Sequence, residues 1–438
     1  MPSKQHGRQY DIVVFGATGY TGKYTAQYIT THLPTDLKWA VAGRSQSKLE
    51  DVVAECNKLN ADRVQPGIEI CNLTDSDLAA LAKKTFILIT TVGPYGKLGE
   101  HAFKACAENG THYLDVTGEV PFVAKMLKKY ESTAKESGAL MFPQIGIESA
   151  PPDLVTWSLA SFIRSEFSSP IRDVTVSIHN LKSAPSGGTI TTALTIFEYF
   201  TLSELRAAYK PYALSPLPRN AGNNNNTNNN DPNNNPNNPH PTPRPKRSLL
   251  TTLTGLIHIP PLGLLTTSPA ASTDAALVQR TWGLLATTPS RQSQQYGANF
   301  SFREYLRPHS WLRGIAIHYG LLALGLVMVT PWLRRAAARW LYKPGEGPDA
   351  EVARGDEIEY WGVGVRDGGV GERAVCRAGF RGSAYYLTGI LVAEAASTLL
   401  EDDVDLPGGV YTAACLGQPY IDRLDRGGFH VETKLLEN

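Results

Sequence analysis

A short, strongly patterned stretch near the N-terminus, residues 11–31 (DIVVFGATGYTGKYTAQYITT), constrains the fold more than any other part of the chain. Four consecutive apolar residues, Ile12 to Phe15, precede a glycine-rich turn and then a helical pattern. A continuous apolar run of this length is typical of a parallel strand that is buried on both faces and feeds a helix. The stretch therefore predicts the first strand, turn and helix of a dinucleotide-binding domain.

Three glycines in this turn have separate roles in the predicted site. Gly16 allows the tight turn, Gly19 lets a pyrophosphate approach the backbone, and Gly22 lets the helix pack against the strand. The free N–H groups of the helix N-terminus face the bound anion. The alternative is a tight turn with no ligand. The residues predicted here to contact the cofactor are Gly16, Thr18, Gly19, Tyr20, Thr21 and Gly22.

The end of the predicted second strand, residues 37–42, indicates which nicotinamide cofactor is bound. NAD sites usually carry an Asp or Glu about 20 residues after the glycines, where it binds the ribose 2′-hydroxyl. This chain has Gly43-Arg44-Ser45 instead, with Lys48 nearby. A guanidinium matches phosphate geometry, so Arg44 and Ser45 predict NADP, with NAD as the second choice and a solvated arginine as the alternative.

The first 170 residues alternate between short apolar runs and amphipathic segments. About six strands and five helices can be assigned there, which predicts an α/β domain with a doubly wound parallel (Rossmann) sheet at residues 1–170. Cofactors of such sheets lie at the carboxyl ends of the strands. The strand at residues 86–92 runs into Gly93-Pro94-Tyr95, and another strand ends before Gly118. Val92, Gly93, Pro94, Tyr95 and Gly118 are therefore predicted as further cofactor contacts.

Three side chains are candidates for the proton-transfer chemistry of a reductase. Tyr95 is the first choice, with Glu119 and Asp153 as lesser ones. Glu148 is, with Asp153, one of the acids nearest the predicted cleft, and acid/base work is an option for both. Each candidate has a structural alternative. Tyr95 could pack against a Gly-Pro turn, Glu119 could complement a helix dipole, and Asp153 or Glu148 could act as a cap or in a salt bridge. No metal site is predicted.

A second α+β domain with a mixed sheet is predicted at residues 171–380, because residues 174–180 (VTVSIHN) alternate with period two. Residues 186–189 (SGGT) are expected to open a helix over 190–208. Residues 220–247 are rich in Asn and Pro and lack apolar anchors, which predicts a disordered insertion. Residues 381–438 are expected to form a C-terminal segment that packs back on both preceding domains.

Composition excludes several classes of partner. Basic and acidic residues nearly cancel, 42 against 41, so net charge does not indicate nucleic-acid binding. The five cysteines are odd in number, widely spaced and without a C-x-x-C pair, which argues against a disulfide framework or a structural zinc site. A reducing, cytosol-facing environment fits this pattern.

Several motifs occur in an order that resembles a known family. They are YDIVVFGATGYTGKY, WAVAGRS, TTVGPYGKLGE, YLDVTGE, GIESAPPDL, SGGT, KPGEGP at 343–348 and GGVYTAACLGQPYIDRL at 408–424. The chain resembles the saccharopine dehydrogenase-like oxidoreductases, in the branch that includes lipid-associated animal proteins and bacterial trans-acting enoyl reductases. The resemblance implies that the glycine turn, Arg44, Gly93 to Tyr95 and Gly118 contact the cofactor. One departure is visible: members often have Asp-Ser-x-Pro where this chain has Glu148-Ser149-Ala150-Pro151.

A 20-residue apolar stretch at residues 314–333 contains no Asp, Glu, Lys or Arg. Its length would suffice to cross a bilayer core. Arginines flank both ends, so charge gives no orientation, and a crossing would separate residues 343–438 from the first domain. We therefore expect the stretch to insert into a membrane or lipid-droplet surface from one side. The alternatives are a buried core or dimer helix and a true span.

These observations predict an NADP-dependent oxidoreductase that reduces an enoyl or carbonyl group of a hydrophobic lipid or polyketide-type substrate. No tyrosine has a lysine four residues later, which disfavours short-chain dehydrogenases. The alternatives are a nucleotide-binding lipid-droplet or membrane protein without turnover, and a true saccharopine dehydrogenase. The expected partners are an acyl or other hydrophobic small molecule, a lipid surface and a second copy of the chain, but no nucleic acid.

Overall fold

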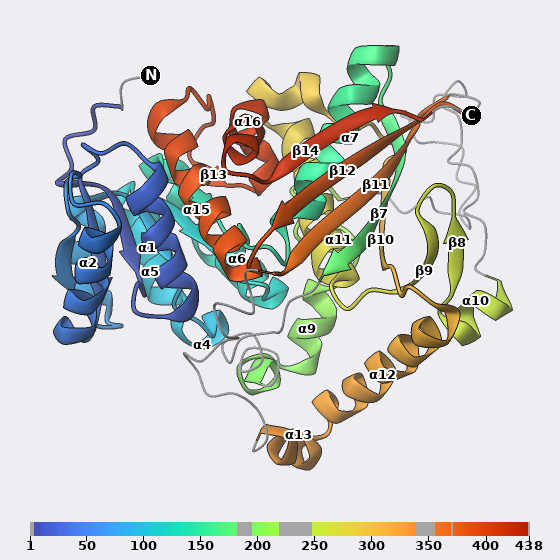
Figure 1. Ribbon diagram of the computed structural model, residues 1–438, viewed down its shortest axis with the longest axis horizontal. Coiled ribbons are helices and arrows are strands. Elements are labelled where there is room, and N and C mark those ends of the chain that lie inside the picture. Colours follow the sequence, from blue (N-terminus) through green and yellow to red (C-terminus); the bar gives the residue numbers. More distant parts are fainter. Residues whose placement is uncertain (1–3, 182–194, 219–247, 339–354, 369–370, 437–438) are drawn as a thin grey trace, which may run out of the picture.

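The computed structural model describes residues 4–181, 195–218, 248–338, 355–368 and 371–436, which form two β-sheets with helices between and around them (Figure 1). The predicted insertion at 220–247 and the SGGT and KPGEGP motifs lie outside the described residues. The five cysteines are all free and buried.

The first sheet is entirely parallel and has the order β13-β6-β5-β4-β1-β2-β3. This arrangement confirms the predicted doubly wound sheet. Strand order reverses between β1 and β4, which is where such folds bind nucleotides. The strands are β1 (Tyr10–Phe15), β2 (Trp39–Gly43), β3 (Gly67–Ile70), β4 (Thr85–Thr90), β5 (His112–Asp115), β6 (Leu140–Phe142) and β13 (Gly409–Val410).

The apolar run of β1 explains why both faces of this sheet are covered. Ile12 and Val14 point into one hydrophobic cluster, whereas Val13 and Phe15 point into another. One face is covered by α1 (Tyr20–His32), α2 (Gln46–Leu59) and α15 (Ala384–Glu401). The other is covered by α3 (Asp75–Lys84), α5 (Glu100–Asn109) and α6 (Val120–Ser137). The first domain therefore depends on a helix from the C-terminal end of the chain.

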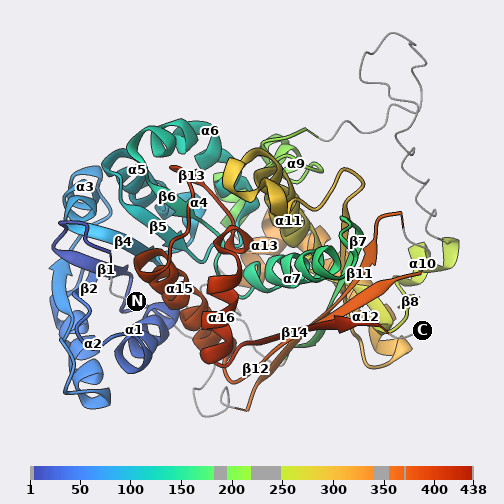
Figure 2. The same ribbon diagram turned by 90° about the horizontal axis from the view of Figure 1, so that it is seen from above.

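The second sheet is mixed, with the order β14-β12-β11-β7-β10-β9-β8, in which β7 and β10 are parallel and the other pairs are antiparallel. This confirms the predicted mixed sheet. Helices α7 (Ala150–Phe167) and α11 (Ala271–Thr287) pack between the two sheets (Figure 2). The strands are β7 (Ile171–Leu181), β8 (Ile257–Ile259), β9 (Gly263–Thr267), β10 (Ser301–Leu306), β11 (Glu357–Arg366), β12 (Arg373–Arg381) and β14 (His430–Leu435).

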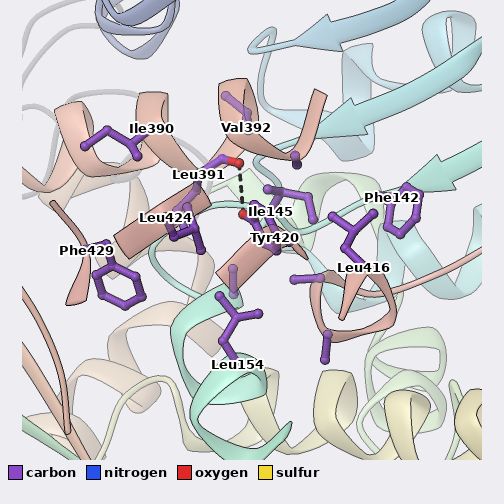
Figure 3. Close-up of a cluster of buried hydrophobic side chains, with 14 of the residues drawn as sticks. Phe142, Ile145, Leu154, Ile390, Leu391, Val392, Leu416, Tyr420, Leu424 and Phe429 are labelled. Carbon is purple, nitrogen blue, oxygen red and sulfur yellow. Dashed lines mark hydrogen bonds between the residues drawn. The ribbon is translucent and has the colours of Figure 1, made fainter. Parts of the chain in front are cut away.

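The C-terminal segment joins both sheets, since β13 pairs with β6 and β14 pairs with β12. Between them, η2 (Ala413–Leu416) and α16 (Gln418–Arg426) pack against α15 and α7. Figure 3 shows this core, where the Tyr420 hydroxyl donates a 2.9 Å hydrogen bond to the Leu391 carbonyl and Phe142 and Leu154 lie close by. The loop between β6 and α7 is therefore anchored at both of its ends.

One local prediction about the second domain needs correction. The expected continuous helix at 190–208 is interrupted: residues 195–199 are helical, and α9 (Leu202–Ala208) starts afresh at Thr201, whose side chain forms a capping box with Glu204. The apolar run at 249–267 forms several elements. It divides into α10 (Leu249–Thr254) and the β8–β9 hairpin, with Pro260 and Pro261 at the turn.

The long apolar stretch forms α12 (Trp311–Val329), which is followed by α13 (Pro331–Ala338) after a break at Thr330. Helix α12 lies along the outside of the second domain (Figure 1). Among the described residues it is the single helix long and apolar enough to cross a membrane, and almost none of it is buried. It is therefore not a core helix of this chain. Its exposed large apolar side chains are Trp311, Leu312, Tyr319, Leu322, Leu324, Leu326 and Val329.

Candidate cofactor and active site

A cleft of about 660 Å³ opens at the carboxyl end of the parallel sheet, where β1 passes into α1. Ten of the residues predicted from sequence as cofactor contacts line it. They are Gly16, Thr18, Gly19, Tyr20, Thr21, Arg44, Val92, Gly93, Tyr95 and Gly118. Three others, Gly22, Ser45 and Pro94, are next to the cleft in sequence but are not part of its lining.

The glycines of the turn are required by the packing around them. Gly16 has a φ of +91°, and a Cβ there would lie 2.7 Å from Val92 Cγ2. A Cβ on Gly22 would lie 2.2 Å from the Gly16 carbonyl oxygen, a backbone atom that cannot move aside. Gly22 therefore sets the close approach of α1 to the turn. Gly19 caps α1 without a side chain, which leaves the helix N-terminus open to an anion.

Basic side chains lie at the end of the cleft next to β2. Arg44 follows β2 directly, Lys48 lies in the first turn of α2, and both are exposed and line the cleft. Ser45 is the N-cap residue of α2, and its hydroxyl lies 3.4 Å from the Ser47 hydroxyl. Two cations without an intervening acid suit a 2′-phosphate.

Tyr95 lines the cleft, but its hydroxyl is directed into the protein. It donates a 2.8 Å hydrogen bond to the Thr90 carbonyl, and the Val116 N–H donates to it at 3.4 Å. The side chain is 5% exposed, and burial raises its pKa well above the usual value. The hydroxyl proton is therefore already engaged, which argues against the predicted role of Tyr95 as proton donor and for its packing role.

Glu119 caps a helix other than its own. Its carboxylate accepts hydrogen bonds from the N–H groups of Tyr95, at 2.7 Å, and Gly96, at 2.8 Å, at the start of α4 (Tyr95–Leu98). Burial raises its pKa to about 6, although these two bonds act in the opposite direction. Glu119 does not line the cleft, so its position supports a structural cap that shapes the Gly93–Tyr95 loop.

Asp153 lies in the core and not in the cleft, so it needs correction as a candidate acid. Its carboxylate accepts bonds from the Thr281 hydroxyl, at 2.6 Å, and the Ala414 N–H, at 3.0 Å. Burial raises its pKa to about 7. These contacts join α7 to α11 and η2, which is a structural role.

The cleft also contains residues that were not among the predicted cofactor contacts or the three candidate proton donors. Glu148 and Ile147 come from the loop after β6, Lys97 from α4, and Tyr385 and Thr388 from α15. The acid of the GIESAPPDL motif was a sequence signal for Glu148, but α15 is more than 200 residues away and carries no local signal. Within the described part of the chain, no group of three His, Cys, Asp or Glu side chains is placed to hold a metal ion.

The parallel sheet, the glycine turn and the basic end of the cleft define a protein with two sheets that binds a dinucleotide cofactor. Residues 12–142 match the family described as the saccharopine dehydrogenase NADP binding domain. The chain thus binds NADP and is an oxidoreductase. The resemblance to the saccharopine dehydrogenase-like oxidoreductases is thus confirmed, and a Bos taurus protein of that name is 38% identical over 34% of this chain and 36% of its own.

Relatives of known name agree with this assignment over most of the chain. A lipid droplet localized protein of Caenorhabditis elegans is 27% identical over 93% of both chains. A protein described as a trans-acting enoyl reductase of Mycobacterium tuberculosis is 28% identical over 98% of both chains. The fold is similar to that of the apo saccharopine dehydrogenase (L-Glu forming) of Saccharomyces cerevisiae, with a TM-score of 0.50 and 11% identity over 97% of this chain and 99% of that one.

Proposed function

We propose that this protein uses NADPH to reduce an enoyl or carbonyl group of a hydrophobic lipid or polyketide-type substrate. The observation that carries the proposal is the cleft, which combines a glycine turn at a helix N-terminus with two cations at one end. Support for an enoyl substrate comes from the relative described as a trans-acting enoyl reductase.

Different residues of the cleft would bind different parts of the cofactor. The N-terminus of α1, with Gly19 and Tyr20, would hold the pyrophosphate, while Arg44 and Lys48 would hold the 2′-phosphate. When bound, the nicotinamide supplies a hydride. The Gly93–Tyr95 loop, whose end is held by the Glu119 carboxylate and the buried Tyr95 ring, would form a rigid wall of the cleft.

The reaction is tested with purified full-length protein, NADPH and a long-chain trans-2-enoyl thioester of coenzyme A. Loss of NADPH absorbance at 340 nm, with the saturated thioester identified by mass spectrometry, would support the proposal. Saturable NADPH binding without consumption of this substrate or of a matching long-chain ketone would instead favour a nucleotide-binding protein without turnover.

We further propose that α10 and α12 hold the protein on the cytosol-facing surface of a membrane or lipid droplet. The apolar side chains of α12 are exposed along its length, and Leu249, Leu250 and Leu253 of α10 are exposed beside it. The Tyr319 hydroxyl of α12 donates a 2.9 Å bond to the Leu253 carbonyl, which joins the two helices. Neither helix contains an acidic residue, so phosphate headgroups would meet no repulsion. The name of the nematode relative supports this surface.

Flotation with phospholipid-coated triolein droplets tests the lipid surface. A double variant, Leu322→Gln with Leu326→Gln, removes two exposed leucines that would each contribute about 1.5–3 kcal/mol when buried in lipid. We expect it to remain in the aqueous fraction while still binding NADPH. The control, Leu59→Gln, changes an equally apolar exposed residue on α2 and should float like the unmodified chain. Equal flotation of all three proteins would contradict the proposal.

A further inference from the structure

One acidic side chain faces the cleft directly. Among the described residues that line it, Glu148 is the single carboxylate. Glu148 lies in the loop between β6 and α7, and its side chain is exposed to the cleft while its neighbour Ser149 is buried. No hydrogen bond or ion pair within the described part of the chain engages this carboxylate, in contrast to Glu119 and Asp153.

The position of Glu148 places it at the end of the cleft away from Arg44. A Cβ on Gly118 would lie 2.7 Å from Glu148 Oε2, so the carboxylate occupies the space left by this glycine. Gly118 follows β5 and Arg44 follows β2, and the order β5-β4-β1-β2 separates them by three strand spacings, or about 14 Å. A dinucleotide with its 2′-phosphate at Arg44 and its pyrophosphate at the glycine turn extends toward Glu148.

The loop that carries Glu148 is held from two other parts of the fold. The Ile147 N–H donates a 3.3 Å hydrogen bond to the Thr388 hydroxyl of α15. The Tyr360 hydroxyl of β11 donates a 3.1 Å bond to the Ile147 carbonyl. The backbone N–H and carbonyl of Ile147, the residue before Glu148, are thus fixed, the N–H by α15 and the carbonyl by β11. Such support restricts the movement of a reactive side chain.

We infer that Glu148 is the proton donor of the reduction and that Tyr360 is its positioning residue. This inference rests on the proposed function. In the reduction of an enoyl thioester, the carbon–carbon π bond breaks, the β-carbon takes the hydride that the nicotinamide supplies, and the α-carbon takes the Glu148 carboxyl proton. The resulting carboxylate recovers a proton from water in the cleft, so one NADPH and one proton are consumed for each double bond.

The surroundings of Glu148 favour its protonated form. Protein around the cleft raises the pKa of Glu148, because the charged form is less well solvated there. Tyr360 of β11 and the buried carboxyl of Asp274, on α11, are near it, and Lys97 of α4 lines the same cleft. The negative charge of Glu148 contributes to the raised pKa of both Asp274 and Tyr360. A general acid with a raised pKa is protonated over more of the working pH range.

Variants of the full chain, assayed with NADPH and trans-2-dodecenoyl-CoA, test this role. We expect Glu148→Gln to lower kcat by about 10²- to 10⁴-fold, the usual contribution of a general acid, with the Kd for NADPH unchanged within about threefold. Glu148→Asp retains an acid and should recover part of kcat. Tyr360→Phe should lower kcat with little change in KM. Glu166→Gln, an exposed acid on α7, is the matched control. Unchanged kcat in Glu148→Gln would overturn the inference.

A titration that needs no turnover separates this inference from the proposed reaction. Protein labelled with ¹³C at the glutamate carboxyl is titrated by NMR, and the Glu148 signal is identified by its loss in Glu148→Gln. We expect a midpoint above the ordinary 4.5, rising further when NADPH, whose reduced nicotinamide ring is uncharged, fills the cleft and excludes water, and falling in Tyr360→Phe. A midpoint at the ordinary value with and without NADPH would overturn the role of Glu148. Absence of turnover in the unmodified protein would instead refute the proposed reaction.

Discussion

Replacing Arg44 by alanine should separate the two nicotinamide cofactors. Arg44 is exposed and makes no hydrogen bond or ion pair with other described residues, so its removal should leave the fold intact. A hydrogen bond to a charged group contributes about 1.5–3 kcal/mol, and exposure to solvent places this one near 1.5–2 kcal/mol. Since 1.4 kcal/mol corresponds to a tenfold change, NADPH should bind about 10- to 30-fold more weakly. NADH lacks the phosphate and should bind within about twofold of its original affinity.

The assay is fluorescence titration of the purified chain with each reduced cofactor at two salt concentrations. Lys58→Ala is the control, because it removes the same charge from the far end of α2, roughly 18 Å along the helix from Gln46. We expect the Lys58→Ala variant to bind NADPH more tightly than NADH, as the unmodified chain does. An equal loss for NADPH and NADH in Arg44→Ala, or an equal effect of Lys58→Ala, would refute the phosphate contact. High salt should narrow the difference between the cofactors, since it screens exposed charges.

Three further changes test the packing and electrostatics around the cleft. Gly22→Ala should lower the free energy of unfolding by about 1–3 kcal/mol and weaken NADPH binding, because the new Cβ meets backbone atoms. The control Gly320→Ala, on the exposed α12, should change neither quantity. Urea unfolding and NADPH titration measure both effects, and equal stability of the two variants would contradict the packing role of Gly22. Folded Asp153, with its pKa raised to about 7 from 3.8, keeps a proton that the unfolded chain releases, so its contribution to stability falls as pH rises from about 4 to 7. The free energy of unfolding of Asp153→Asn should fall less between pH 5 and pH 7 than that of the unmodified chain. An identical fall in both proteins would exclude the Asp153 carboxyl as the cause of the pH dependence. Thr201→Ala removes the capping box of α9 and should lower the free energy of unfolding, measured with urea, by about 0.5–2 kcal/mol. An unchanged free energy of unfolding would mean that packing alone holds α9.

Local patterns in the sequence were sufficient to predict the first domain. The apolar run of β1 and its glycines predicted a buried strand that feeds a helix, and the structure has both. Strands β2 and β4 have a similar local signal because they are buried on both faces. The second domain was less predictable. Strands β11, β12 and β14 were not anticipated, since their partners are distant in the chain.

The candidate site was predictable where it depends on backbone and not where it depends on tertiary contacts. Gly16 and Gly118 were found from turns at strand ends, and both line the cleft. The directions of acidic side chains could not be found in this way. Asp153 precedes a helical pattern and was a reasonable candidate, but its carboxylate turns toward α11. Glu148, five residues earlier, faces the cleft because Ile147 is held by distant segments.

A crystal structure of the full chain with NADP⁺ would show where each part of the cofactor lies. We expect the 2′-phosphate within hydrogen-bond distance of Arg44, the pyrophosphate at the N-terminus of α1, and the nicotinamide ring beside Gly118 and the Glu148 carboxylate. An empty cleft at saturating NADP⁺, or a nicotinamide ring directed away from Glu148, would contradict this expectation.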